Sequence, residues 1–297
     1  MNMYKASLLS SLFSVVAMAQ VMASDDLTFM GKEERISGGG VSAVTPLFPG
    51  LSRDMKNLIL GKYLDGKDRL KLRVVSRDAK AMVDDFGCLK LKYTMTTEQI
   101  IEFFKRSGAS VQHMNFSNLR PVCTDSVLAA IKEFCPKIKS VSLSDCTKIT
   151  DEGLAHLAGA IAVDLSDCTQ ITNAGLAHLS SAIEVILSDC TQITNAGLAH
   201  LSRATAVGLS GCTQITDAGL AHLAGATMVD LSGCAQITNA GLTHLSRATA
   251  VDLSGCTQIT DAGLAHLSRA TVVYLYGTQI TMSAKQALLK RGVRVCF

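Results

Sequence analysis

A cysteine and a histidine recur together at a fixed spacing through the second half of the chain. The stretch LSDCTQITNAGLAHLS occurs twice without change, at residues 165–180 and 187–202, and near-copies begin at Leu209, Leu231 and Leu253. In each copy the histidine follows the cysteine by ten residues. Thiolate and imidazole are common zinc ligands and also form a nucleophile–base pair. The pattern raises the hypotheses of a metal site and of a Cys–His nucleophile, and the elements that carry these residues decide between them.

The copies share the pattern A-x-x-V-x-L-x-x-C-x-x-I-T-[ND]-A-G-L-x-H-L, with a period of 22 residues. This pattern is typical of a leucine-rich repeat. Val163 and Leu165 alternate in a short strand, so both side chains enter the core. Cys168 follows where the chain turns, and its buried thiol fills the corner and bonds weakly to neighbouring backbone. The six cysteines of this structural column are Cys146, Cys168, Cys190, Cys212, Cys234 and Cys256.

The helix of each repeat is expected to separate the cysteine from the histidine. Thr172 with Asn173 supplies the N-cap, and Leu176 and Leu179 form the inward stripe. His178 then points outward on the convex side. Zinc needs its ligands at about 2.0–2.3 Å and a base must reach its nucleophile, so we expect no metal site, no catalytic pair and no cofactor. The histidines form a solvated, copied column, although stacked imidazoles could bind adventitious metal. That column is His156, His178, His200, His222, His244 and His266.

A single repeat cannot bury its own apolar face, but stacked repeats share a continuous core. We therefore predict an α/β fold, a leucine-rich-repeat solenoid shaped as a horseshoe with a parallel β-sheet on its concave face. The predicted segments are irregular leading repeats at 87–140, cysteine-type repeats at 141–281 and a C-terminal cap at 282–297. Within the irregular parts we expect strands at 89–91, 114–116 and 293–297, and helices at 97–105, 128–134 and 283–291.

The first residues have the layout of a secretory signal peptide. Lys5 precedes an apolar run from Ala6 to Ala19, and small residues stand before Ser24. The alternative is a membrane anchor, but the run is short and no cluster of positive charges follows it. We predict a signal peptide at 1–23 and a disordered linker at 24–43, hence export and no membrane span after cleavage.

Charge argues against nucleic acid as a partner. Residues 1–140 hold 20 Lys and Arg against 14 Asp and Glu, and residues 141–297 hold 8 against 11. Neither half has the dense basic face of a nucleic-acid binder, and no aromatic platform for stacking bases is evident. We expect protein partners and a monomeric chain.

Residues 44–86 precede the repeats and contain apolar sets at helical spacing, such as Met55, Leu58 and Ile59. One interpretation is a helical cap that closes the solenoid. The stretch YLDGKDRLKLRVVSRDAKAMVDD also resembles the F-box, and the Ile-Thr-[Asp/Asn]-x-Gly-Leu step of the repeats resembles the cysteine-containing subtype known from F-box/leucine-rich-repeat proteins. The usual tryptophan of the F-box is Ala79 here. Both segments occur in that family's order.

The resemblance implies a non-enzymatic substrate adaptor of a cullin-type (SCF-type) ubiquitin ligase. The F-box-like face would bind a Skp-type adaptor, and the concave repeat face would bind the target protein. The implied adaptor-binding residues are Met55, Leu58, Ile59, Leu64, Leu72 and Val75.

The strand residues that point away from the core form columns on the concave face, and they vary between otherwise copied repeats. Variation there is what a binding surface requires. The predicted target-binding residues are Asp164, Glu184, Ile186, Met228, Asp230, Asp252, Tyr274 and Tyr276. Because large aromatic and Arg anchors are few, the alternative is that duplicated repeats have no specific partner.

Three hypotheses reconcile a signal peptide with an F-box. The first is a bacterial protein exported as an F-box-like effector that acts in the cytosol of a eukaryotic host. The second is a secreted or periplasmic leucine-rich-repeat binding protein in which residues 44–86 are only a cap. The third is a cytosolic eukaryotic F-box protein whose first 23 residues merely resemble a signal. We favour the first.

Overall fold

The computed structural model describes residues 82–83, 88–90, 95–117 and 119–296. The chain divides into two units, and all described residues belong to the second, residues 72–297. The predicted signal peptide, linker and adaptor-binding residues, from Met55 to Val75, lie outside the described residues. The second unit is described below by itself.

The described strands form one eleven-stranded sheet in which sequence order and spatial order coincide. β1 (Met82–Val83) is antiparallel to β2 (Cys88–Lys90), and every later strand runs parallel to its neighbour. The remaining strands are β3 (His113–Asn115), β4 (Ser140–Ser142), β5 (Ala162–Asp164), β6 (Glu184–Ile186), β7 (Ala206–Gly208), β8 (Met228–Asp230), β9 (Ala250–Asp252), β10 (Val272–Tyr274) and β11 (Arg294–Cys296). The predicted leucine-rich-repeat solenoid is confirmed.

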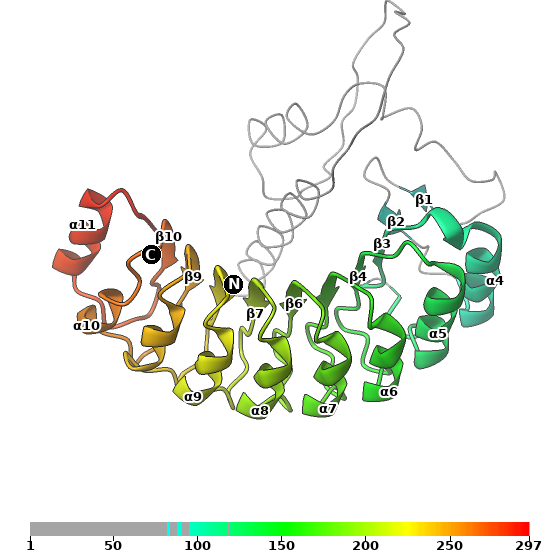
Figure 1. Cartoon of the computed structure of the whole chain (residues 1–297), viewed down its shortest axis with the longest axis horizontal. Helices are drawn as coiled ribbons and strands as arrows, with labels where there is room; N and C mark the ends of the chain where they lie inside the picture. Colours follow the sequence, from blue (N-terminus) through cyan, green and yellow to red (C-terminus); the bar gives the residue numbers. More distant parts are fainter. Residues whose placement is uncertain (1–81, 84–87, 91–94, 118, 297) are drawn as a thin grey trace, which may run out of the picture. The chain divides into compact units, whose positions relative to one another are not determined.

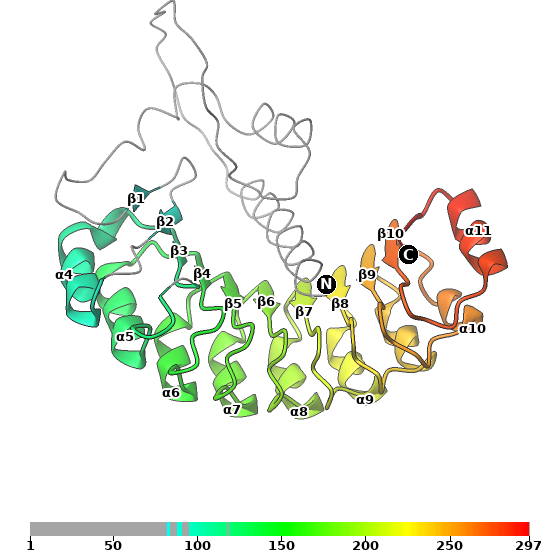
Figure 2. The ribbon, with the colours of Figure 1, turned by 180° about the vertical axis from the view of Figure 1, so that it is seen from behind.

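The described helices lie on one side of this sheet, along its outer, convex side (Figures 1 and 2). Each 22-residue repeat carries one short helical segment, in most repeats an α-helix that a 3-10 turn continues, and in the repeat after β8 the 3-10 helix Gly241–Leu245 alone. The α-helices are α4 (Thr97–Ser107), α5 (Asp125–Phe134), α6 (Asp151–Leu154), α7 (Asn173–Leu176), α8 (Asn195–Leu198), α9 (Asp217–Leu220), α10 (Asp261–Leu264) and α11 (Met282–Lys290). The 3-10 helices are η1 (Gly108–Ser110), η2 (Ala155–Leu157), η3 (Ala177–Leu179), η4 (Ala199–Leu201), η5 (Ala221–Leu223) and η6 (Gly241–Leu245).

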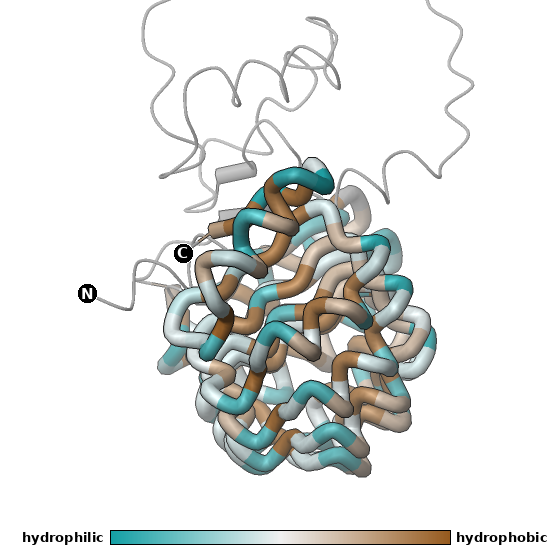
Figure 3. Tube along the Cα trace, turned by 90° about the vertical axis from the view of Figure 1, so that its left-hand side faces the viewer, coloured by the Kyte–Doolittle hydropathy of each residue, from teal (hydrophilic) through white to brown (hydrophobic). Residues whose placement is uncertain are grey.

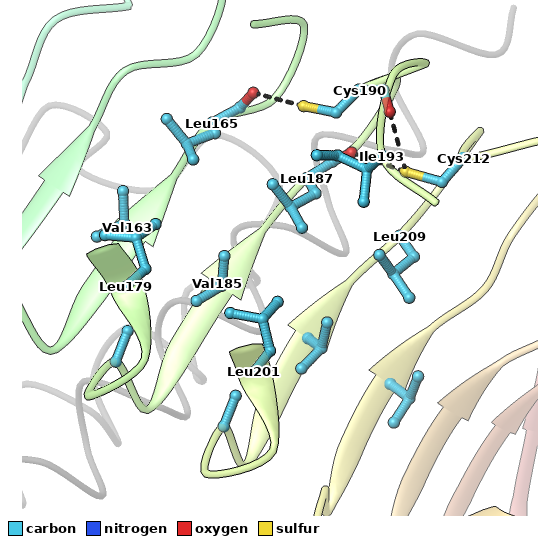
Figure 4. Close-up of a cluster of buried hydrophobic side chains, with 14 of the residues drawn as sticks. Val163, Leu165, Leu179, Val185, Leu187, Cys190, Ile193, Leu201, Leu209 and Cys212 are labelled. Carbon is cyan, nitrogen blue, oxygen red and sulfur yellow. Dashed lines mark hydrogen bonds between the residues drawn. The ribbon is translucent and has the colours of Figure 1, made fainter. Parts of the chain in front are cut away.

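The core is a set of stacked columns that run the length of the repeats. In one repeat, Val185, Leu187, Ile193, Leu198 and Leu201 are all at most 1% exposed. Figure 4 shows equivalent side chains of neighbouring repeats meeting between strand and helix, and Figure 3 shows hydrophobic positions recurring from coil to coil. Each repeat therefore buries its apolar face mainly against the next repeat. This is why a unit much smaller than a domain can be stable within the stack.

Some boundaries differ from the sequence prediction. α5 begins at Asp125, three residues before the predicted start, because Thr124 already has the extended backbone of an N-cap and Asp125 and Ser126 form the polar first turn. A pattern search that starts at the first buried leucine misses such a turn. β2 and β3 begin one residue earlier than predicted, since sheet pairing places Met114 opposite Val141.

Candidate protein-binding face

The inner side of the sheet carries the variable columns that the sequence predicted. Asp164 pairs in register with Ile186 on the next strand, and Asp230 pairs with Asp252. At the C-terminal end Tyr274 follows Asp252 in the same column. These five residues form one column of the inner face, one residue after the buried valines, and Glu184 and Met228 lie in a second column one residue before the valines.

Exposure differs sharply along this face. Glu184, Ile186, Met228, Asp230 and Asp252 are each at most 6% exposed, although no described element lies over the inner side of the sheet. Asp164 and Tyr274 are only partly buried, and Tyr276 is 64% exposed. Within the described part of the chain, the predicted residues open to solvent thus lie toward the two ends of the row.

Burial changes the acidity of the carboxyl groups on this face. Desolvation, followed by repulsion from Asp164, raises the pKa of Glu184 to about 8, and Glu184 Oε1 has no hydrogen-bond partner. Desolvation and the neighbouring Asp252 raise the pKa of Asp230 to about 6. The Asp164 carboxylate, in contrast, has hydrogen-bond partners, because it accepts hydrogen bonds from the Ser142 and Ser166 hydroxyls. The Glu184 carboxyl group is therefore either protonated or, when ionised, destabilised by its surroundings.

The cysteine column lies inside the turn after each strand. Cys190 Sγ donates to the Leu165 carbonyl at 3.1 Å, and Cys212 Sγ donates to the Leu187 carbonyl at 3.0 Å (Figure 4). Desolvation raises the pKa of both thiols to about 12. The nine cysteines from Cys123 onward are free, and eight of them are buried. A buried, protonated thiol is a poor nucleophile, so this column joins repeats and offers no reactive group.

The six histidines of the repeats lie on or directly after the helical segments of the convex side. His178, His200 and His222 are exposed, whereas His156, His244 and His266 are partly buried. Among the described residues, no cluster of three or more metal-ligating side chains occurs. The same part of the chain contains no helix with the length and apolarity to cross a bilayer.

A second polar column was missed by the sequence reasoning. Asn173 was expected to share the N-cap with Thr172, but Thr172 alone caps the helix, accepting from the Ala174 amide at 3.2 Å. Asn173 Oδ1 instead accepts from the Thr194 amide of the next repeat at 3.0 Å, and its Nδ2 donates to Thr194 Oγ1 at 2.8 Å. The prediction for Asn173 is therefore wrong, because its partner lies 21 residues away.

This interaction recurs seven times and is named the Asx–Thr ladder below. Its pairs are Asp125–Thr150, Asp151–Thr172, Asn173–Thr194, Asn195–Thr216, Asp217–Thr238, Asn239–Thr260 and Asp261–Thr281. The signal in the sequence was the restriction of that position to Asp or Asn. From Asp151 onward, the glycine two residues after each Asp or Asn of the ladder is part of the same arrangement. Gly197 follows Asn195 by two residues, and a Cβ on Gly197 would lie 2.5 Å from Asn173 Oδ1 of the preceding repeat.

The turn before each cysteine carries a left-handed residue. Asp145, Asp167 and Asp189 have φ angles of 64°, 61° and 57°, and glycine takes the same place from Gly211 onward. Burial, followed by repulsion from the flanking aspartates, raises the pKa of Asp167. Arg120 pairs with Asp145 at 2.5 Å and closes one end of the acidic column.

Comparisons with known proteins agree with this architecture. The family profile described as Leucine Rich repeat matches residues 134–158 and 249–268. Among solved structures, a complex of Rad7 and Elc1 in yeast contains a similar chain, with a TM-score of 0.51, 16% identity, and 69% of this chain matched to 65% of that one. Internalin C2 from Listeria monocytogenes shares 20% identity over 67% of this chain and 90% of its own, with a TM-score of 0.43. No curated protein matches the sequence.

The matched region thus spans just under two thirds of the Rad7–Elc1 chain, and at this identity the likeness concerns the fold. Fold, repeat pattern and family profile together define a protein built of leucine-rich repeats. Solenoids of this class present an extended concave surface suited to binding other proteins.

Proposed function

We propose that this chain is a non-enzymatic interaction protein whose inner sheet face binds a target protein. The observation that carries this proposal is the contrast within each repeat. Val185, Leu187 and Cys190 repeat almost without change and are buried, whereas the inner-face positions change from Glu184 to Ala206 in the next repeat. Rad7, in the similar structure, was solved bound to another protein, Elc1, which also supports a role in protein binding.

We further propose that residues 44–86 link the bound target to a Skp-type adaptor of a cullin-type ubiquitin ligase. The support is the F-box resemblance of Tyr63–Asp85 and its position directly before the repeats. Such a chain needs no catalytic group of its own, because it acts by raising the local concentration of target near the ligase. The exported-effector hypothesis adds the signal-like residues 1–23 to this role.

Affinity purification with the full chain from a eukaryotic lysate tests the adaptor proposal. We expect a Skp-type adaptor to be recovered with the wild-type chain and lost on Leu64→Asp, which places a charge in the implied adaptor face. Leu289→Asp is the matched control, since Leu289 is 50% exposed on the C-terminal helix. Equal recovery with both variants, or no adaptor at any salt concentration, would contradict the proposal.

The signal-like N-terminus favours a second candidate, a secreted or periplasmic binding protein in which residues 44–86 only close the solenoid. This candidate also binds protein through the inner face but recovers no adaptor. Sequencing the N-terminus of the protein made in its own cell tests export directly. We expect the mature chain to begin at Ser24, and an intact Met1 would contradict export in either candidate.

A further inference from the structure

The exposed large hydrophobic side chains of the described residues gather at the C-terminal end. They are Tyr276, Met282 and Leu289, which are 64%, 61% and 50% exposed. The repeats that precede them expose none. An end cap needs a polar outer surface for solubility, so apolar exposure confined to this end is unexpected for a mere cap.

Two tyrosines replace Asp252 and Ser254 of the preceding repeat on the inner face. Tyr274 follows Asp252 in its column. Tyr276 takes the place of Ser254, because the Tyr276 carbonyl accepts from the Gly255 amide just as the Ser254 carbonyl accepts from the Gly233 amide. The repeats close with serine at this position, so the solenoid does not require the ring of Tyr276.

The last strand adds a cation beside these rings. Arg294 lies opposite Val272, and Cys296 lies opposite Tyr274, so all four share the inner face. Burial raises the pKa of Tyr274, and the nearby Cys296, Asp252 and Arg294 also influence this pKa electrostatically. Tyrosine and arginine are the residue types that most often anchor protein interfaces, and here they stand together.

The charge of this end is opposite to that of the repeats. Residues 282–297 hold four cations (Lys285, Lys290, Arg291 and Arg294) and no Asp or Glu, whereas residues 141–281 hold four cations against eleven acids. A partner that approaches this end meets a local excess of positive charge. Charge complementarity therefore favours an acidic occupant.

The backbone at this end can also take a further strand. Among the described strands, β11 pairs only with β10. The Arg294 amide donates to Thr271 and the Cys296 carbonyl accepts from Leu275, so residues on either side of Val295 face β10. In a parallel ladder alternate residues bond to opposite sides. The N–H and C=O of Val295 consequently point to the open edge, where an extended peptide can pair.

We propose that the C-terminal end of the inner face, formed by Tyr274, Tyr276 and Arg294 beside the open edge of β11, docks an extended acidic segment of a partner protein. The inference deepens the proposed function and rests on it, because it names where on the inner face the target is held and its chemistry. Carboxylates of the segment pair with Arg294, its apolar side chains pack on the tyrosine rings, and its backbone pairs with Val295.

A labelled extended peptide of alternating glutamate and valine is the probe, and its alternating lysine and valine counterpart is the control. Fluorescence anisotropy measures binding to the full chain. We expect the acidic peptide to bind and the basic peptide not to bind. Arg294→Glu should weaken binding about tenfold and Tyr276→Ala about fivefold. Arg247→Glu, an equal charge change at an exposed residue in a loop before β9, should leave the affinity unchanged.

Equal binding of both peptides, or an equal loss in Arg247→Glu, would overturn the inference. So would a chain dimer that dissociates on Arg294→Glu in gel filtration, since it would assign this end to a second copy. Failure of the proposed function looks different. If target capture depends on Asp164 and not on Arg294, the inner face binds its target but this docking site is wrong. If the chain captures no protein, the proposed function itself fails.

Discussion

The two halves of the repeat region share the same stacked core but have different residues in the turn before the cysteine. The left-handed turn residue is aspartate at 145, 167 and 189, and glycine at 211, 233, 255 and 277. The backbone hydrogen bond is the same in both, from Asp167 to the Ser188 carbonyl and from Gly233 to the Ser254 carbonyl. An L-residue with a side chain is strained in this conformation and glycine is not. The difference teaches that the stacked core and its hydrogen bonds set the turn, while the turn residue is free to set local charge.

The largest effect should come from the shared core and should be equal in the two halves. Leu187 and Leu209 are fully buried equivalents in neighbouring repeats, one with the aspartate turn and one with the glycine turn. Truncation to alanine leaves a cavity, so Leu187→Ala and Leu209→Ala should each lower the free energy of unfolding by about 2–5 kcal/mol. Chemical denaturation measures both. A difference of more than about 1 kcal/mol between the two variants would contradict the view that the two halves share an equivalent core.

Glu184 allows a comparison of neighbouring repeats at one position of the inner face, because the residues that pair with it on the two adjacent strands are both alanine. Its folded pKa is about 8, above the ordinary 4.5, so the folded state binds the proton more tightly than the unfolded state. Stability is therefore lost as pH rises from 4.5 towards 8. Glu184→Ala should raise the free energy of unfolding by about 1–3 kcal/mol above pH 8, and this gain should shrink steadily below it.

Denaturation curves at several pH values check this prediction. Ala206→Ser, at the next position of the same column, is the control and should show no comparable pH dependence. A gain from Glu184→Ala that is the same at pH 4.5 and pH 8 would mean that the gain does not come from the ionisation of Glu184.

One residue pair of the Asx–Thr ladder connects the two halves of the repeat region. Asn195 Oδ1 accepts from the Thr216 amide at 3.0 Å, and Asn195 Nδ2 donates to Thr216 Oγ1 at 2.7 Å. Asn195→Ala leaves a partly buried amide without its acceptor, so we expect a loss of about 1–2 kcal/mol. Thermal unfolding measures the change. Ser202→Ala, at an exposed position of the same repeat, should have little effect, and equal losses would show that the ladder contributes nothing.

Exchanging the turn residues should give the smallest effect, with opposite signs in the two halves. Asp167→Gly removes left-handed strain and repulsion from Asp145 and Asp189, and should stabilise the chain by about 0.5 kcal/mol. Gly233→Asp introduces that strain and should destabilise it by about 0.5–1 kcal/mol. Differential scanning calorimetry on both variants checks the pair. Changes of the same sign would mean that the two turns are not equivalent.

The repeat period and its apolar positions were enough to predict the fold, because each repeat contributes the same strand, turn and helix. The placement of Val163, Leu165 and Leu176 in the core also followed from local periodicity. Asn173 illustrates where this reasoning stops. Thr-Asn before a helix is a good local cap, and the sequence contains no local sign that the asparagine instead bonds a residue 21 positions later.

The inner face shows the same division. Sequence alone determined which residues share it, since strand side chains alternate and the repeats are in register. Sequence could not determine that Glu184 and Asp230 are buried while Tyr276 is exposed, nor that Arg294 lies opposite Val272 on the same face as Tyr274. Periodicity is a local property of the chain, whereas burial, pKa and proximity depend on what the rest of the folded chain places next to each residue.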